Sequence, residues 1–252
     1  MTTAIAVPLA GLWARQVRPA LIVALDPRRS LTTYVGYDPD DIDQGVYSLF
    51  QGGPDSRSSA ASILLPTDFE NLFLMPASTA LATLDRQLGA REGMGLVIGR
   101  ALGQLRERFA HVFIDCPPVL GVLMINAMAA SEHLLIPVQT EFLALKGLER
   151  MMRTLSMVTQ ARRIPLHYTI VPTMFDRRTR ASLQTLKVLR ERYPGELWKS
   201  VIPVDTQFRE ASRQGLPLSV LNAHARGTIA YTALLNDLLG PDERIVQQAA
   251  AQ

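Results

Sequence analysis

The 252-residue sequence is poor in cysteine, in lysine and in aromatic residues, which make up only 6% of it. Its single cysteine, Cys116, excludes a fold held together by intramolecular disulfides. No apolar stretch is long enough to span a membrane, and the N-terminus lacks the basic segment, apolar run and small-residue cleavage site of a signal peptide. These absences predict a cytoplasmic protein with no membrane partner. The hydrophobic fraction of 48% excludes disorder as the main state.

Two common kinds of catalytic site are also missing from the sequence. It contains no G-x-S-x-G turn of the kind that carries a serine nucleophile. The histidines have no metal-ligand spacing, so we interpret them as structural; they are His111, His133, His167 and His224. Cys116 is interpreted as a small buried residue.

Positive charge is concentrated in one third of the chain. The net charge is +3, and 23 of the 26 cationic residues are arginine. Residues 150–226 hold fourteen Lys/Arg and five Asp/Glu, a net charge of +9, whereas residues 1–149 carry −4 and residues 227–252 carry −2. Arginine binds phosphate through paired hydrogen bonds. The pattern indicates a phosphate-rich partner, and the competing interpretation is a solvated helix face.

Short apolar runs alternate with segments of helical periodicity along the chain. We predict strands at residues 20–25, 72–75, 111–115, 133–136, 168–171 and 201–202. We predict helices at residues 94–109, 121–131, 144–162, 178–193 and 227–239. This alternation predicts an α/β fold, with a mostly parallel sheet and helices on both faces. We expect one domain over residues 1–240 and a flexible C-terminal tail over residues 241–252.

Two acidic residues stand at the C-terminal ends of predicted strands. Asp26 follows the strand at residues 20–25, and Asp115 ends the strand at residues 111–115. Ligands of such sheets bind beyond the C-terminal ends of the strands. One acid at such a place is most often a turn or cap residue, but two on adjacent central strands indicate a site.

Five motifs, in this order and spacing, resemble the ParA/MinD/Soj family of partitioning ATPases. They are Leu25-Asp26-Pro27 with Ser30-Leu31-Thr32, Ile114-Asp115-Cys116-Pro117-Pro118, residues 130–148, residues 172–180, and Ile202-Pro203 through Glu210-Ala211 to Gly215-Leu216-Pro217. The resemblance covers residues 2–239 and is strongest toward ParA-like proteins encoded with flagellar and chemotaxis genes. It implies a P-loop NTPase-like fold of the SIMIBI type.

The resemblance also implies ATP and Mg²⁺ as cofactors and assigns residues to them. Asp26, which would orient the attacking water, and Asp115 are the implied catalytic residues, while Thr2 and Asp115 are the implied Mg²⁺ ligands. The implied nucleotide contacts are Thr2, Thr3, Pro117, Pro118, Thr173, Pro203 and Asp205. The implied DNA contacts are Arg177, Arg178, Arg180, Lys187, Arg190, Arg209 and Arg213. Because aromatic residues are few, we expect contact with the DNA backbone rather than base stacking.

The sequence departs from the family pattern around the nucleotide. The family opens with a strand and a K-G-G-V-G-K-T-T loop whose N–H groups and lysines hold phosphates, whereas Met1 here falls at the lysine position. Ala24 replaces the first acid of the family's D-L-D-P, and Arg28 and Arg29 replace the glutamine and glycine that follow. Pro8 falls inside the first helix, which it should kink. We therefore expect the first central strand and the P-loop to be missing, and the chain as written to be an inactive ATPase.

Three functions remain open on this fold. The first is a partitioning or polar-positioning protein for chromosomes, plasmids or chemotaxis clusters, placed at the nucleoid or the cell pole. Its intact relatives act as ATP-dependent DNA-binding dimers, which implies non-specific DNA, a ParB-like or polar adaptor protein and a second copy as partners. The second is a non-catalytic interaction module. The third is a nucleotide-independent DNA-binding regulator.

Overall fold

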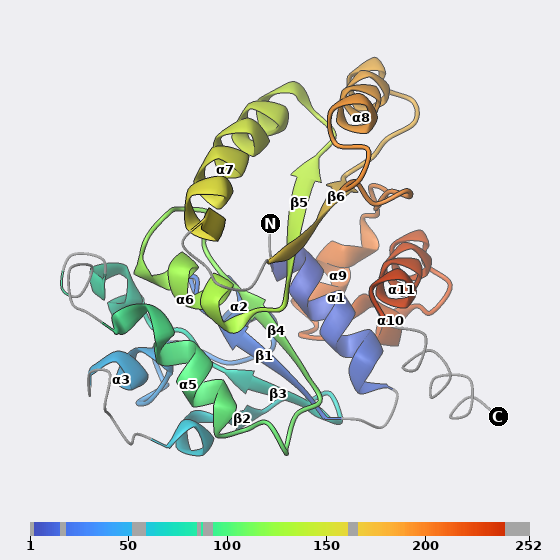
Figure 1. Ribbon diagram of the computed structural model, residues 1–252. Coiled ribbons are helices and arrows are strands. Elements are labelled where there is room, and N and C mark those ends of the chain that lie inside the picture. The colour runs from blue at the N-terminus through green and yellow to red at the C-terminus, as the bar shows by residue number, and fades with distance from the viewer. Residues whose placement is uncertain are drawn as a thin grey trace.

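The computed structural model describes residues 3–15, 19–51, 59–84, 87, 93–160 and 166–239, and every structural statement concerns these residues. Strands and helices alternate along the chain and form two mostly parallel sheets with helices around them (Figure 1). No helix in these ranges is long and apolar enough to cross a membrane. Thr2 and the predicted tail at residues 241–252 lie outside the described residues.

The larger sheet has four strands in the order β2-β3-β1-β4. Their bounds are Leu65–Pro66 for β2, Leu72–Met75 for β3, Ala20–Ala24 for β1 and His111–Asp115 for β4. β1 pairs in parallel with β3 and β4, whereas the short β2 pairs antiparallel with β3. All of β1 is buried, as expected for a strand with parallel neighbours at both edges and helices on both faces. The three strands predicted in this region are confirmed, and β2 is additional.

The smaller sheet consists of β5 (His133–Gln139) and β6 (His167–Thr173), which pair in parallel along their whole length. Within the described residues, no ladder of hydrogen bonds joins β4 to β5. The mostly parallel α/β fold is thus confirmed, but its sheet is divided. The division lies on the side of β4 that faces away from β1.

Helices surround both sheets. Their bounds are Thr3–Ala14 (α1), Ser30–Tyr34 (α2), Val46–Gln51 (α3), Val97–Gly103 (α5), Val122–Ala130 (α6), Phe142–Gln160 (α7), Arg180–Arg192 (α8), Gln207–Arg213 (α9), Leu218–Leu221 (α10) and Arg226–Leu238 (α11). α1 packs on β1, β4 and α11, α5 packs on α6, and α7 packs on β5 and α8. In Figure 1, α1 and α11 lie on one side of β4, and α5 and α6 lie on the other.

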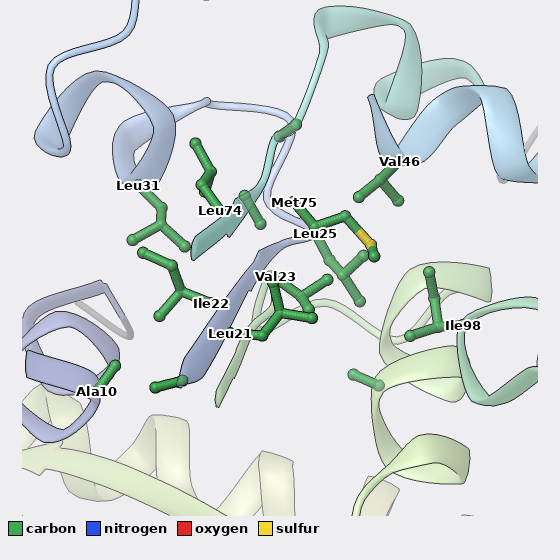
Figure 2. Close-up of a cluster of buried hydrophobic side chains, with 14 of the residues drawn as sticks. Ala10, Leu21, Ile22, Val23, Leu25, Leu31, Val46, Leu74, Met75 and Ile98 are labelled. Carbon is green, nitrogen blue, oxygen red and sulfur yellow. The ribbon is translucent and has the colours of Figure 1, made fainter. Parts of the chain in front are cut away.

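The larger core is built around β1. Leu21, Ile22 and Val23 are completely buried, and Figure 2 shows them among side chains from the neighbouring strand and helices, namely Leu31, Val46, Leu74, Met75 and Ile98. Burial of each such side chain contributes about 1.5–3 kcal/mol. A second cluster, which includes Ile136, Leu148 and Leu189, lies under α7 and α8 on the smaller sheet. Val171 of β6 belongs to the larger cluster, so the two cores meet at the smaller sheet.

α1 contains Pro8 but continues past it to Ala14. The expected kink does not end the helix, because α1 is apolar on nearly every side and is held by packing. Val7, Leu9 and Ala10 are completely buried, and a helix that is apolar all round is stable only in a core.

Two predicted elements are wrong in extent. The helix predicted at residues 94–109 is a 3₁₀ turn at Met94–Leu96 followed by α5, which ends at Gly103. After α5 the chain forms tight turns, in one of which the Leu105 N–H donates to the Leu102 carbonyl oxygen at 3.0 Å. Glycine has low helix propensity, and Gly99 and Gly103 both fall in this segment. Arg108 is consequently not in the last turn of a helix, and its guanidinium lies 4.8 Å from the centre of the Phe73 ring.

The strand predicted at residues 201–202 is an isolated bridge between Phe175 and Pro203. Proline has no N–H to continue a ladder of hydrogen bonds, so the pairing stops there. The remaining predicted strands and helices are confirmed to within three residues at each end.

A glycine in α1 provides a test of this packing. A Cβ atom at Gly11 would lie 2.4 Å from Cγ of Pro217, which precedes α10. We expect Gly11→Ala to lower the free energy of unfolding by roughly 1–3 kcal/mol, because the rigid proline ring must move. The matched control is Gly147→Ala in α7, where a Cβ meets nothing within 4 Å. It should raise stability by about 0.5–1 kcal/mol through helix propensity. Urea denaturation measures both, and equal stabilities would contradict the close approach of α1 to Pro217.

Candidate functional site

The pairing of β1 with β4 brings two acids to one edge of the larger sheet. The Leu25 N–H donates to the Asp115 carbonyl oxygen at 2.8 Å, so the two strands are still paired where Asp26 follows. Asp115 is only 1% exposed, whereas Asp26 is partly exposed. The two carboxylates predicted to carry the chemistry therefore lie at the same edge.

α1 begins at this edge. The Thr3 hydroxyl donates to Oδ2 of Asp115, which joins the first helical residue to the end of β4. The sequence assigned Mg²⁺ to Thr2, which lies outside the described residues, and Thr3 is the described hydroxyl that contacts Asp115. A hydroxyl beside a carboxylate is the kind of oxygen pair that Mg²⁺ prefers.

A cavity of about 320 Å³ opens beside Thr3 and Asp26. Its wall includes the side chains of Arg28 and Arg209, both exposed. Its other lining residues are Pro8, Ser30, Tyr34, Phe208 and Ser212. Sequence reasoning missed Tyr34 and Phe208, because they come from separate segments and belong to no motif. Oδ1 of Asp26 accepts the Arg28 N–H at 3.0 Å, which holds the turn after β1.

The described residues fit Mg²⁺–ATP only in part. Thr3 and Asp115 supply the oxygen atoms that a magnesium ion needs. A triphosphate needs in addition a loop of N–H groups and a lysine. Among the described residues, the wall of this cavity contains no lysine.

Four predicted nucleotide contacts lie elsewhere. Pro117 and Pro118 lie between β4 and α6, Thr173 is buried at the end of β6, and Pro203 forms the bridge to Phe175. None of them lines the cavity beside Thr3 and Asp26. Their roles stay predictions.

Asp205 has a structural function in the described fold. Its Oδ1 accepts the Gln207 N–H and its Oδ2 accepts the Gly227 N–H, both at 3.0 Å. One carboxylate thus satisfies N–H groups at the first turns of α9 and α11, where acidic side chains are stabilising. Its assignment to the nucleotide also stays a prediction.

The histidines have structural surroundings. The rings of His111 and Trp13 are in contact, with their centres 3.6 Å apart and their planes tilted by 39°. Nε2 of His133 lies 2.8 Å from the Thr169 hydroxyl. Burial lowers the pKa of His133, and the charge of His167 adds to this shift. Within the described ranges, no three His, Cys, Asp or Glu residues are grouped so that they could hold a metal ion.

The predicted DNA contacts lie on the turn before α8, on α8 itself and on α9, and all seven side chains are exposed. Thr179 fixes the start of α8, because its hydroxyl accepts the Ser182 N–H. Arg180 is therefore the first residue of the helix, and Arg177 precedes it on the turn.

Two of these arginines are neutralised by neighbouring carboxylates. Nε and Nη2 of Arg178 donate to Asp176, at 3.0 Å and 2.8 Å, and Arg213 donates to Glu210 through the same two atoms. Hydrogen bonds from Arg178 lower the pKa of Asp176 to about 2. Those from Arg213, and then from Gln214, lower the pKa of Glu210 to about 2. Both acids therefore stay ionised throughout the physiological range.

The other predicted DNA contacts are paired weakly or have no carboxylate partner among the described residues. Nζ of Lys187 lies 3.8 Å from Glu191, at the limit of an ion pair. Four arginine side chains have no carboxylate partner in the described part of the chain; they are Arg177, Arg180, Arg190 and Arg209. Counting charges along the sequence could not separate these four from Arg178 and Arg213.

Cys116 provides a test of the acidic edge. Burial raises the pKa of its thiol to about 12, and the negative charges of Asp115 and Asp26 add to the shift. Because the thiolate is the reactive form, iodoacetamide should alkylate the folded protein at least about tenfold more slowly than the urea-denatured chain at pH 8. The rate should rise steadily up to about pH 10 without a plateau. A plateau near pH 9 would show an ordinary thiol and would contradict the burial of Cys116 beside the two acids.

The sequence matches a protein-family model described as an AAA domain over residues 1–168. The sporulation initiation inhibitor protein Soj of Bacillus subtilis is 31% identical over 219 residues, which are 86% of this chain and 85% of that protein. The chromosome partitioning protein ParA of Caulobacter vibrioides is 30% identical over 234 residues, which are 92% of this chain and 86% of that protein.

Solved structures share the fold. A cobyrinic acid a,c-diamide synthase from Mycobacterium smegmatis, with bound ADP and magnesium, is 31% identical with a TM-score of 0.78, over 94% of this chain and 87% of that one. The Cyanothece McdA(D38A)–ATP complex has a TM-score of 0.81 at 19% identity, over 95% of this chain and 92% of that one. These matches and the sequence relatives above agree with the family resemblance that the sequence motifs indicated. The chain belongs to the ParA/MinD/Soj family of partitioning ATPases.

Proposed function

We propose that this protein is a ParA-type partitioning or positioning factor that contacts DNA non-specifically, and that the 252-residue chain does so without being switched by ATP. The observation that carries the proposal is the set of four exposed arginines without carboxylate partners among the described residues, Arg177, Arg180, Arg190 and Arg209, on α8, α9 and the turn before α8. The cargo would be a chromosome, a plasmid or a chemotaxis cluster. A ParB-like or polar adaptor protein and a second copy are the partners that the family suggests.

The chemistry of this surface favours the DNA backbone. An exposed guanidinium binds phosphate through two hydrogen bonds and releases counterions in doing so. The nearby aromatic residues Phe175, Tyr193 and Phe208 are only partly exposed, and the whole chain is only 6% aromatic, which disfavours base stacking. The binding should therefore be weak and indifferent to sequence.

The nucleotide part of the proposal depends on what surrounds Asp26. A P-loop supplies several charge-assisted hydrogen bonds, and the loss of three costs roughly 4–9 kcal/mol, or about three to six decades of affinity. Ala24 removes one acid of the family motif, and Arg28 occupies the wall of the cavity beside Asp26. Without a bound γ-phosphate, Asp26 has no attacking water to orient.

The two alternatives predict different behaviour. An interaction module would bind neither DNA nor nucleotide and would use the fold as a platform. A DNA-binding regulator would prefer one sequence over another, which requires contacts to base edges. The partitioning proposal predicts DNA binding that is equal for unrelated duplexes.

The first test concerns ATP. We expect the 252-residue chain to release phosphate from Mg²⁺–ATP no faster than its Asp26→Ala variant, with or without DNA, because no phosphate is held for either to act on. Release of inorganic phosphate is measured for both proteins at equal concentration. Turnover in the unaltered chain that Asp26→Ala abolishes would show a functional ATPase and overturn this part of the proposal.

The second test concerns DNA. We expect a dissociation constant of roughly 10⁻⁴–10⁻⁶ M whose logarithm varies linearly with the logarithm of salt concentration. Arg177→Ala with Arg180→Ala should weaken binding to every duplex alike and reduce the salt slope by about 0.9 for each phosphate that is no longer bound. The matched control is Asp176→Ala with Arg178→Ala, which deletes a neutralised pair and leaves the net charge unchanged. It should bind almost as the unaltered protein does.

Salt titrations of the three proteins on two unrelated duplexes give all the values needed. If the Arg177/Arg180 variant binds DNA as well as the unaltered protein, these arginines face solvent without contacting DNA, and the interaction module is favoured. If one duplex is strongly preferred, the regulator is favoured.

A further inference from the structure

The helix α7, the longest among the described residues, carries cations and large apolar side chains on the face that it turns to solvent. Figure 1 shows α7 on the outside of the smaller sheet. The buried face of α7 is explained by the fold, because Leu145, Leu148 and Leu155 are at most 9% exposed and pack in the core under α7 and α8. The solvent face belongs neither to the acidic edge nor to the predicted DNA contacts.

Six exposed side chains form one stripe along this face, which we call the α7 stripe; they are Phe142, Leu143, Lys146, Arg150, Arg153 and Met157. Successive residues of a helix are about 100° apart, so these six positions fall within about a third of its circumference. The apolar members are unusually accessible, at 66% for Phe142, 74% for Leu143 and 59% for Met157. Large apolar side chains grouped with cations on one face indicate an interaction surface.

The cations of the α7 stripe are neutralised only in part. Nζ of Lys146 donates to Glu149 at 3.0 Å, and Arg192 of α8 donates to the same carboxylate. Glu149 is the only acid in the sequence of α7, so two cations share one negative charge. Arg150 and Arg153 have no carboxylate partner within the described ranges. The stripe is therefore positive at its centre and apolar at both ends.

Charge argues against two of the partners that such a stripe can have. A two-fold contact with a second copy would set one basic stripe against another, and like charges across an interface repel. DNA would bind the two arginines, but it would leave Phe142, Leu143 and Met157 against a hydrated phosphate backbone that offers them no apolar contact.

The spacing of the apolar side chains argues against a folded protein partner. Leu143 and Met157 are separated by about four helical turns, or roughly 21 Å at 1.5 Å per residue, and the cations lie between them. Protein interfaces instead gather their apolar anchors at a buried centre and place charges at the rim. A lipid surface accepts apolar side chains wherever they enter it, and it offers anionic headgroups to the cations between them.

We propose that the α7 stripe binds an anionic membrane surface, with α7 lying in the plane of the headgroups. The apolar ends of the stripe enter the boundary between headgroups and acyl chains, and its central cations lie among the headgroups. The sequence predicted no membrane partner because no stretch is long enough to span a bilayer, but a helix that lies on the surface does not need that length. The inference does not rest on the proposed function, since none of the predicted DNA contacts belongs to α7.

The first test is co-sedimentation of the full chain with lipid vesicles. One set contains equal parts of phosphatidylglycerol and phosphatidylcholine, and the other contains phosphatidylcholine alone. We expect at least about tenfold tighter binding to the anionic vesicles, and weaker binding as the salt concentration rises, because headgroup charge attracts the cations and salt screens it. Failure to bind anionic vesicles, or equal binding to both sets, overturns the proposal.

Charge variants locate the binding on α7. Arg150→Gln with Arg153→Gln should weaken binding to anionic vesicles by at least about tenfold, since each cation near such a surface contributes about fivefold. The matched control is Arg106→Gln with Lys199→Gln, which removes the same charge from exposed positions outside α7. It should bind the vesicles almost as the unaltered protein does. Equal losses in the two variants would show attraction by overall charge and overturn the proposal.

Apolar variants test insertion. Leu143→Ser with Met157→Ser should also weaken vesicle binding by at least about tenfold, and the fold should persist because both side chains are exposed. The matched control is Leu183→Ser with Val220→Ser, at exposed apolar positions on α8 and α10. It should bind as the unaltered protein does. Normal binding by the Leu143/Met157 variant would show that the apolar ends do not enter the lipid.

An environment-sensitive dye gives a readout that does not depend on affinity. The dye is attached at Met157→Cys, and Cys116 reacts slowly because burial raises the pKa of its thiol. Emission should shift to the blue on anionic vesicles, whereas a dye at Leu183→Cys should not shift. The absence of a shift at position 157, or an equal shift at 183, contradicts the proposed orientation. The Arg150/Arg153 variant should bind DNA as the unaltered protein does, so failure of this proposal is distinguishable from failure of the proposed function.

Discussion

The pairing of β1 with β4 is the interaction on which the rest of the site depends. Their register sets Ala24 beside Asp115, and Asp26 follows at the same edge. Thr3 then attaches α1 to that edge through its hydrogen bond to Asp115. Because β1 is buried on both faces and paired at both edges, it cannot shift without unpairing the larger sheet. The position of the acids is therefore a consequence of the core and not of the loops around them.

Much of this frame could be predicted from the sequence, because each strand is a short apolar run ended by a proline, a polar residue or an acid. Two elements were predicted wrongly. Glycines interrupt the helix predicted at residues 94–109, and Pro203 limits the pairing of the strand predicted at residues 201–202. Periodicity reports neither which strands pair nor which side chains meet across the fold. The division between β4 and β5, and the meeting of Tyr34 with Phe208 in one cavity wall, therefore required the structure.

The sequence differs from the family pattern at several positions, and the structure shows the physical consequence of one of these differences. Arg29, which stands where the family has glycine, adopts φ = 62°, in the left-handed region that glycine occupies without penalty. Holding an arginine there costs roughly 1–2 kcal/mol, and the ion pair of Arg29 with Asp40 offsets part of that cost. The basic segment shows the same need for the structure. A count of charges treats Arg177 and Arg178 alike, but among the described residues only Arg178 is paired with a carboxylate.

Charge of opposite sign gathers on different parts of the described structure. The larger sheet, with Asp26 and Asp115, belongs to residues 1–149, which carry a net charge of −4, while α8 and α9 belong to the segment that carries +9. DNA is attracted to the second part and repelled by the first, so its contact is confined to the side of α8 and α9. The acidic residues at the ends of β1 and β4 and the basic side chains of α8 therefore lie on different elements, and each can contribute its own electrostatic field to a partner.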